Sequence, residues 1–167
     1  MNGTVDAAAM SLAGVTASDD DVKLTADGNL TFEGAVNLAE GDLFLDVNGD
    51  LSQLAVGTIE TAGLGLMVDG TIVLNEANDV DVLAIDSQGA AQFNDVNNIM
   101  VGSVSIEAVS ANRAMFAMNG TVDAAAMSLA GISTASSLSL VADGNIFQDQ
   151  PVVVGGDAVL DLSLIHI

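Results

Sequence analysis

The chain has no cysteine, tryptophan or tyrosine, a single proline, and only two lysine and arginine residues among its 167. The lack of cysteine excludes disulfide bonds, thiolate metal sites and cysteine nucleophiles. Because 23 acidic residues give a net charge of −21, there is no basic patch for nucleic acid or for an anionic membrane surface. No uncharged apolar run is long enough to span a bilayer, so we expect no membrane insertion.

Apolar residues nevertheless make up 50% of the chain, whereas aromatic residues make up only 3%. Most of the apolar content is therefore alanine, valine, leucine, isoleucine and methionine. Small and branched side chains of this kind suit a narrow, layered core better than a thick globular one. We interpret the acidic excess as solvated turns, with uptake of a divalent cation such as calcium as the alternative.

A long repeat is visible in the sequence MNGTVDAAAMSLAG, which occurs at residues 1–14 and again, unchanged, at residues 118–131. Ordinary sequence precedes the second copy. We therefore expect Met1 to match an internal position of a longer repeating unit, and the chain to be a fragment that is incomplete at both ends.

The last six residues, LSLIHI at 162–167, resemble the translation of an adaptor used in sequencing libraries. We expect this segment to be an artefact and limit the repeat region to residues 1–161. His166 is the only histidine and lies in this segment, so we assign it no role.

A shorter period is marked by a small or apolar residue, then usually Asp or Asn, then Gly. The marker glycines are Gly3, Gly28, Gly49, Gly70, Gly89, Gly120 and Gly144. All but one of their spacings fit one turn of a β-solenoid. The exception is the longest, from Gly89 to Gly120, which requires an insertion, and we expect a protruding loop or an extra strand around residues 101–107.

Three positions hold apolar residues at a fixed distance from the marker glycines. Two residues after the glycine stand Val5, Leu30, Leu51, Ile72, Ala91, Val122 and Ile146. Four residues before it stand Leu24, Leu45, Leu66, Ile85, Phe116 and Leu140, and six before it Val22, Leu43, Leu64, Leu83, Ala114 and Leu138. Residues two apart share one face of a strand, so these columns are predicted to face inward. The mixed column between the last two is predicted to face outward: Lys23, Phe44, Gly65, Ala84, Met115 and Ser139.

Stacked coils would bury the apolar columns as continuous ladders, which no single coil could do alone. The pattern therefore predicts an all-β fold, a right-handed parallel β-helix (β-solenoid) with about 19–25 residues per coil over residues 1–161. β-Branched and leucine-rich runs with almost no proline agree with this prediction.

The residue before each marker glycine is an aspartate or carries an amide. These residues are Asn2, Asp27, Asn48, Asp69, Gln88, Asn119 and Asp143. Equivalent side chains in neighbouring coils would lie about 4.8 Å apart, so adjacent carboxylates would repel each other. No two aspartates are neighbours in this column, which we interpret as charge spacing along one edge of turns.

The sequence assigns no catalytic, cofactor-binding or metal-binding residue. DVNGD at residues 46–50 resembles the start of an EF-hand loop, but Leu51 and Gly57 stand where that loop requires Gly and Glu. Lys23 and Arg113 are far apart in the sequence and are interpreted as surface charges, so neither supports acid–base catalysis. We expect no enzyme activity and no cofactor, with calcium as the one possible ligand.

The segments VKLTADGNL at 22–30, LSLVADGNI at 138–146 and VVVGGDAVL at 152–160 resemble coils of filamentous-haemagglutinin-like exoproteins. These are large bacterial surface adhesins that are often exported by two-partner secretion. The resemblance implies an extended β-helical shaft that is secreted and lies at the cell surface. It also implies a host or surface glycan or protein as partner, bound through other parts of the full protein.

The leading functional hypothesis is therefore a structural shaft segment of a secreted or surface-attached adhesin-like repeat protein, without catalysis. One alternative is a calcium-binding surface or matrix protein, and another is the non-catalytic part of a carbohydrate-active β-helix enzyme. The coils at both ends would present unpaired strand edges, so we expect the isolated chain to self-associate end to end.

Overall fold

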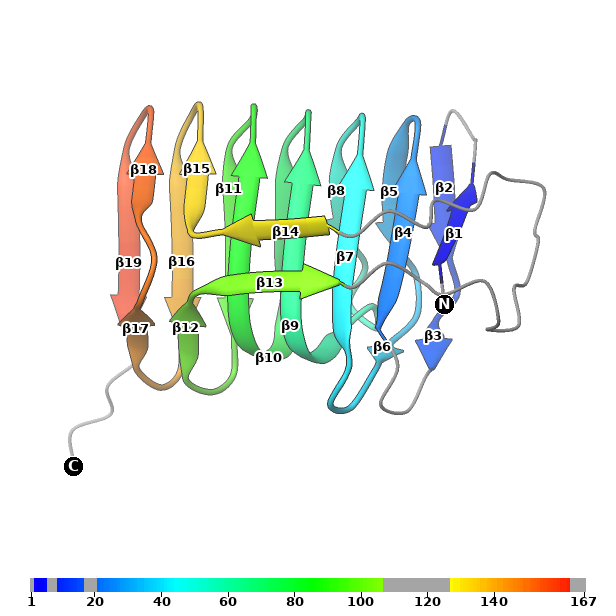
Figure 1. Ribbon diagram of the computed structural model, residues 1–167, viewed down its shortest axis with the longest axis horizontal. Helices are drawn as coiled ribbons and strands as arrows, with labels where there is room; N and C mark the ends of the chain where they lie inside the picture. The colour runs from blue at the N-terminus through cyan, green and yellow to red at the C-terminus, as the bar shows by residue number, and fades with distance from the viewer. Residues whose placement is uncertain (1, 6–8, 17–20, 107–126, 163–167) are drawn as a thin grey trace.

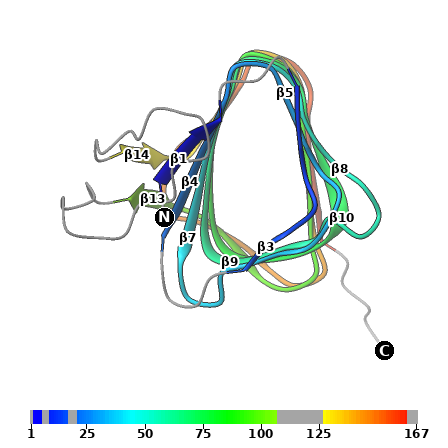
Figure 2. The ribbon, with the colours of Figure 1, turned by 90° about the vertical axis from the view of Figure 1, so that its right-hand side faces the viewer.

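The computed structural model describes residues 2–5, 9–16, 21–106 and 127–162, and all regular structure in these ranges is β-strand. The chain winds into about six turns of a β-solenoid, with the strands of successive turns side by side (Figure 1). Seen along the solenoid axis, each coil is a rounded triangle with three faces (Figure 2). The all-β solenoid predicted from the sequence is confirmed.

Parallel strands make up each face. The first face contains β1 (Asn2–Val5), β4 (Val22–Ala26), β7 (Asp42–Val47), the ends of β9 (Ile59–Val68) and β10 (Ile72–Ser87), β12 (Ile99–Val101), β15 (Ile132–Thr134), β17 (Ile146–Gln148) and β18 (Val152–Val154). The second face contains β2 (Ala9–Leu12), β5 (Asn29–Phe32), β8 (Leu51–Gln53), the start of β10, β11 (Ala91–Asp95), β16 (Leu138–Ala142) and β19 (Ala158–Leu162). The third face is shorter and contains β3 (Val15–Thr16), β6 (Val36–Asn37), the start of β9 and the middle of β10.

The predicted inward columns are confirmed by the strand register of the early coils. Leu43 stacks between Val22 and Leu64, and Leu45 stacks between Leu24 and Leu66. These columns and their counterparts on the second face form one buried apolar core. The number of residues per coil differs between faces. More residues separate the stacked pair Asn37 and Glu60 on the third face than separate the stacked pairs of β7 and β9 on the first face.

Four of the marker glycines occupy one corner of the coil, between the first and second faces. A Cβ on Gly49 would lie 2.7 Å from the carbonyl carbon of Gly28, and one on Gly70 would lie 2.7 Å from that of Gly49. The backbone of Gly89 in turn donates a 3.1 Å hydrogen bond to the carbonyl of Gly70. Successive turns therefore approach too closely for any side chain at this corner, which explains the recurrence of glycine.

The structure corrects the register at the other marker glycines. Gly3 lies in β1 beside Leu24, and Gly144 lies at a different corner, where its backbone N–H bonds to the carbonyl of Asn97 at 2.9 Å. The spacings that involve these two glycines therefore do not measure a coil. An Asp-Gly or Asn-Gly turn suits any corner of a three-sided coil, so the motif alone does not identify which corner it forms. Gly120 lies outside the described residues.

Because the motif does not identify its corner, the sequence pattern assigned β16 to the wrong face. Leu138 and Leu140 pair with Ala91 and Phe93 on the second face, not with the first-face column to which the sequence pattern assigned them. Four coil steps lead along the first face from Val22 to Val101, and β16 lies on the face that follows. The similar segments β4 and β16 therefore lie on different faces, the first and the second.

The predicted insertion is confirmed as an extra pair of strands. Val101 pairs with Leu83 and Ile132 pairs with Ile85, so residues 102–131 take the place of the single residue Ala84. Within this insertion β13 (Ser103–Ile106) and β14 (Met127–Ala130) form an antiparallel two-stranded sheet, which we call the flank hairpin. Residues 107–126 between the two strands lie outside the described residues, and so do Ala114, Met115, Phe116 and Val122.

Candidate interaction surface

The flank hairpin lies across the outer side of the first face, with its strands roughly perpendicular to those of the coils (Figures 1 and 2). β13 contacts β7, β9 and β10, and β14 contacts β9 and β10. The hairpin leaves and rejoins the solenoid through two glycines that bond to each other, because the N–H of Gly131 donates to the carbonyl of Gly102 at 2.8 Å. Gly131 has φ = +76°, a left-handed conformation that favours glycine.

A second apolar layer forms where the hairpin meets the first face. Phe44 points away from the coil interior, because it alternates with the core residues Leu43 and Leu45, yet its exposed fraction is 0%. Ala84 and Val104 are also buried, and none of these three side chains belongs to the main core cluster. The outward column is therefore outward as predicted, but the hairpin converts its middle part into a packed interface.

Gly65 makes room for the aromatic ring in this second layer. It follows Phe44 in the outward column, one coil further along. A Cβ at Gly65 would lie 2.6 Å from Cδ2 of Phe44, which is closer than any real carbon contact. The ring of Phe44 consequently lies over the backbone of the next coil, beneath the hairpin.

Lys23 stands in the same outward column, one coil before Phe44. Its exposed fraction is 3%, so the interpretation of Lys23 as a surface charge is wrong. Burial of an ammonium group is unfavourable unless charge partners or hydrogen bonds compensate the loss of solvent. Arg113 and His166 lie outside the described residues.

Two carboxylates stack at the lower edge of the first face. The backbone N–H of Asp42 donates to Oδ1 of Asp21 at 3.0 Å. Burial, and secondly the neighbouring charge of Asp21, raise the pKa of the Asp42 carboxyl. The next residue in this column is uncharged, because Gly63 stacks on Asp42. A Cβ on Gly63 would lie 2.5 Å from a carboxylate oxygen of Asp42, so the position has no room for a side chain.

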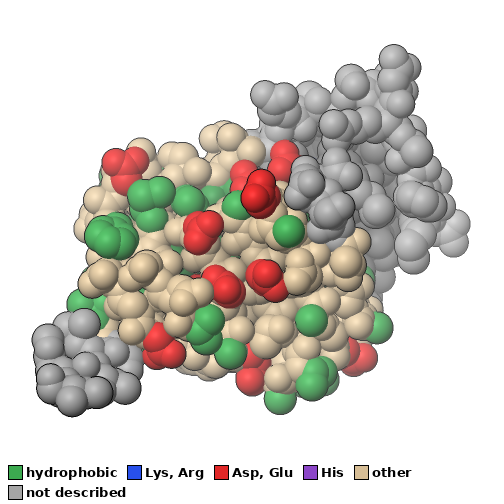
Figure 3. Space-filling model, turned by 90° about the horizontal axis from the view of Figure 1, so that it is seen from below, with side chains coloured by type: hydrophobic (Ala, Val, Ile, Leu, Met, Phe, Trp, Pro, Cys, Tyr) green, Lys and Arg blue, Asp and Glu red, His purple; other side chains and the backbone are tan. Residues whose placement is uncertain are grey.

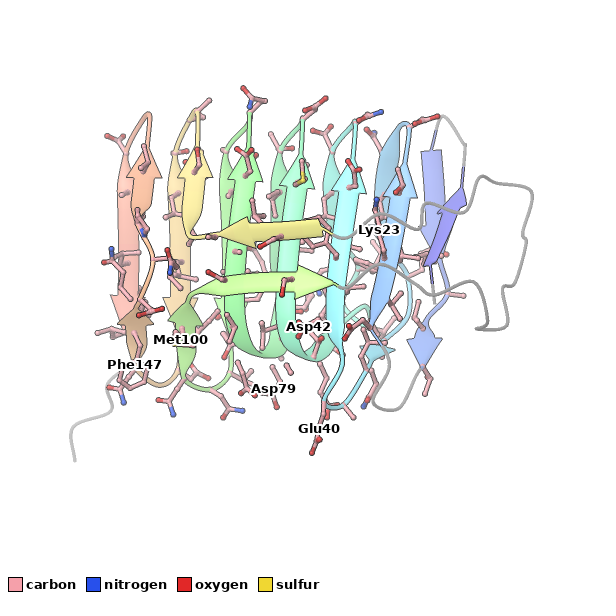
Figure 4. The ribbon with its side chains drawn as sticks, viewed as in Figure 1. Lys23, Glu40, Asp42, Asp79, Met100 and Phe147 are labelled. Carbon is pink, nitrogen blue, oxygen red and sulfur yellow. The ribbon has the colours of Figure 1, made fainter. Side chains whose placement is uncertain are left out.

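Beyond Gly63 the same column becomes apolar. Val82, Met100 and Phe147 stack in successive coils, and Figure 4 shows Met100 and Phe147 along the lower edge toward the C-terminal end. Phe147 is 54% exposed, and the last coil also exposes Val153 and Val159 on its outer surface. The solenoid is therefore acidic at this edge in its early coils and apolar in its last one.

Polar side chains fill the corner between the second and third faces. Asn78 is fully buried, accepts the N–H of Ile59 at 3.0 Å, and donates to the carbonyls of Leu74 and Asn94 at 3.1 and 3.0 Å. In the next coil Asp95 takes this position. These side chains satisfy backbone groups that the bend leaves without ladder partners, so this buried polar cluster is structural.

Asp95 accepts hydrogen bonds from the backbone N–H groups of Val80 and Asn97, at 2.9 and 2.8 Å. Burial nevertheless raises its pKa to about 6, because both bonds together offset only part of the loss of solvent. Asp95 is thus the described carboxyl group whose titration is most strongly altered by the fold.

The acidic turns form a hydrogen-bonded ladder on the outside of the glycine corner. Oδ1 of Asp50 accepts both the backbone N–H and the hydroxyl of Thr71, each at 2.8 Å, and these bonds lower the pKa of Asp50. The amide of Asn48 donates to Oδ1 of Asp27 at 3.3 Å, as the charge-spacing interpretation requires. The DVNGD segment is accordingly a coil corner.

The turn column is shorter than the sequence suggested. Asp27, Asn48, Asp69 and Gln88 occupy it, and Ala135 continues it after the insertion. Asn2 instead lies in β1 beside Lys23, and Asp143 bonds to the backbone of Asp95 at another corner. Figure 3 shows the opposite side of the molecule, seen from below, where acidic side chains lie among hydrophobic and uncharged polar ones.

Within the described ranges, no group of three or more His, Cys, Asp or Glu side chains could hold a metal ion. The same ranges contain no helix that is long and apolar enough to cross a membrane. The surface features that distinguish this chain are therefore the flank hairpin and the apolar last coil. Comparison with protein families, with curated proteins and with solved structures found no match to the chain.

Proposed function

We propose that this chain is a segment of the structural shaft of a secreted or surface-attached, adhesin-like bacterial repeat protein, and that it carries no catalysis. The observation that carries the proposal is the continuity of the coil stack. Leu43, Leu64, Leu83 and Val101 stack in one unbroken column, and the coil resumes in register at Ile132 after the insertion. Each coil covers the apolar residues of its neighbours, so such a stack forms a long, stiff rod and does not enclose a binding site.

The resemblance of the coil sequences to filamentous-haemagglutinin-like exoproteins supports the adhesin-like context. In this proposal the glycan or protein partner binds elsewhere in the full protein, and this segment acts as a spacer. Its corner turns contain side chains that bond to the adjacent coil, as Asp50 does to Thr71. Side chains engaged along the stack in this way strengthen the shaft.

Labelling of intact cells tests the location. Antibodies raised against the purified chain should stain cells that express the protein without permeabilisation, and brief protease treatment of the cells should remove the signal. Staining that appears only after permeabilisation would overturn the surface location.

Resequencing across both ends of the gene tests the shaft itself. Flanks that continue the long repeat begun by MNGTVDAAAMSLAG at residues 1–14 and 118–131 support the shaft. Flanks that close the frame into a short protein with clustered basic residues favour the carbohydrate-active alternative.

Calcium titration separates the shaft from the calcium-binding alternative. A ligand that binds only the folded state raises the melting temperature by an amount that grows with the logarithm of its excess over Kd. The shaft proposal predicts equal melting temperatures in millimolar CaCl2 and in MgCl2, since both ions only screen the acidic turns. A large rise specific to calcium would favour the alternative, and the stacked Asp21 and Asp42 would be the first residues to replace.

A further inference from the structure

Where both are described, at residues 10–14 and 127–131, the two copies of MNGTVDAAAMSLAG have different structures. In the first copy, Met10, Ser11 and Leu12 belong to β2, which pairs in parallel with β5 on the second face. In the second copy the same residues, 127–129, belong to β14, which pairs antiparallel with β13 in the flank hairpin. One sequence is thus compatible with both a coil strand and a hairpin strand, and its surroundings decide between them.

We propose that β13 is a docking site for residues 10–13 of a second copy of this chain. The incoming strand would replace β14 and join two solenoids side by side at the flank. The occupant follows from sequence identity: residues 10–13 read MSLA, and so do residues 127–130. Every contact that β14 makes with β13 can therefore be made by residues 10–13 of another molecule.

The register of the exchanged strand follows from that of the hairpin. Ser103, Val104 and Ser105 stand opposite Ala130, Leu129 and Ser128. After exchange they would face Ala13, Leu12 and Ser11 of the second copy. The side chain that decides the docking is leucine, because Val104 is buried in the second apolar layer and lies opposite Leu129.

In the isolated chain used for the test below, the donor strand is one of the easier strands to release. β2 pairs with β5, and within the described ranges no other strand pairs with it. Leu12 is only partly buried, whereas Phe32, which stacks on it in the following coil, is fully buried. Detaching this strand exposes less apolar surface than detaching a strand from the middle of the stack.

The tethered β14 strand competes with the incoming one. Its contacts are identical, but it belongs to the same chain as β13, so its pairing is intramolecular and has an effective concentration that a second molecule must exceed. Exchange is therefore suppressed in dilute solution and favoured where copies are crowded side by side. It is also favoured where the tethered strand is weakened, and this provides the test.

The test uses engineered cysteines, since the chain has none of its own. The recipient carries Ser105→Cys together with Leu129→Asp, which weakens its own β14. The donor carries Ser11→Cys. Ser105 and Ser128 face each other and are exposed, and directly opposed strand residues lie within reach of a disulfide, so Ser105→Cys with Ser128→Cys in one chain is the positive control.

After mild oxidation of the mixture, mass spectrometry counts mixed disulfides between recipient and donor. We expect at least a tenfold higher yield than with a recipient that keeps Leu129, and loss of that yield when the donor also carries Leu12→Asp. Equal yields with and without Leu12→Asp would overturn the proposal, as would the absence of mixed disulfides when the positive control forms.

A recipient with Leu129→Ala repeats the test with a milder change in case the aspartate disturbs the fold. Circular dichroism verifies that each recipient keeps its strands, which is expected because Leu129 lies outside the main core cluster. The experiment uses purified protein, so its failure would not bear on the shaft function, and the cell-labelling result would not bear on the exchange.

Discussion

Phe44→Ala tests whether the flank hairpin is held by a second apolar layer separate from the solenoid core. Phe44 has an exposed fraction of 0% but is not part of the main core cluster. Truncation of a buried phenylalanine to alanine costs about 3–5 kcal/mol. Because the ring packs between the hairpin and the first face, we expect most of this cost to appear as opening of the hairpin, whose open population should rise about 100-fold for a loss of about 3 kcal/mol.

Hydrogen exchange resolved along the chain measures this opening. Amides of β13 and β14 should exchange about 100-fold faster in Phe44→Ala, whereas those of β8 and β11 should change little. Phe93→Ala is the control for the main core, where the exposed fraction is 1%, and it should lower the melting temperature of the whole solenoid. Phe147→Ala removes a ring that is 54% exposed and should leave both quantities nearly unchanged. If Phe44→Ala instead destabilises all strands equally, as Phe93→Ala does, the separate layer does not exist.

Three further changes probe the corners of the coil. Burial raises the pKa of Asp95 to about 6 from 3.8, so the folded state prefers the protonated form, and the free energy of unfolding should fall by about 1–3 kcal/mol as the pH rises from 4 to 6 and then level off. Asp95→Asn should remove this step from chemical denaturation curves, and a step that persists in the variant would refute the assignment. Gly131→Ala should lower the free energy of unfolding by at least about 1–2 kcal/mol, because φ is +76° and the new Cβ would overlap the carbonyl oxygen of Pro151. A thermal melt identical to that of the parent chain would contradict this prediction. Asn48→Asp should lower the melting temperature at low salt, by placing a carboxylate beside Asp27, and molar NaCl should restore most of the loss; an unchanged melt at low salt would count against charge spacing.

The inward columns could be predicted because they obey a rule that holds in every coil. Leu43 and Leu45 are two apart and recur as Leu64 and Leu66, and burial of both columns is what makes the coils stack. The corner glycines Gly49 and Gly70 were equally predictable, since backbone contact between turns excludes a side chain at that position.

The outward positions could not be predicted in the same way, because their burial depends on a segment far away in the sequence. Nothing in the sequence around Phe44 shows that β13, several coils later, packs over the first face. The one available signal was an aromatic residue in an outward column followed, one coil later, by Gly65. Such a pair leaves room for the ring against the next coil, but it does not identify the segment that covers the other side of the ring.

The mismatch between the long repeat and the coil explains why equal sequences take unequal places. Ala26, Asp27, Gly28 and Asn29 form the corner between the first and second faces, whereas the identical ADGN at residues 142–145 forms the next corner of the triangle. The long repeat thus advances the chain by four turns and about one further face.

The inward residues fit any of the three faces, because each face requires only that apolar side chains alternate along the strand. The outward residues, by contrast, change their neighbours with each repeat. Identical residues can therefore be coil strand in one repeat and hairpin strand in the next, as residues 10–12 and 127–129 are. This freedom is what makes the exchange between copies chemically possible.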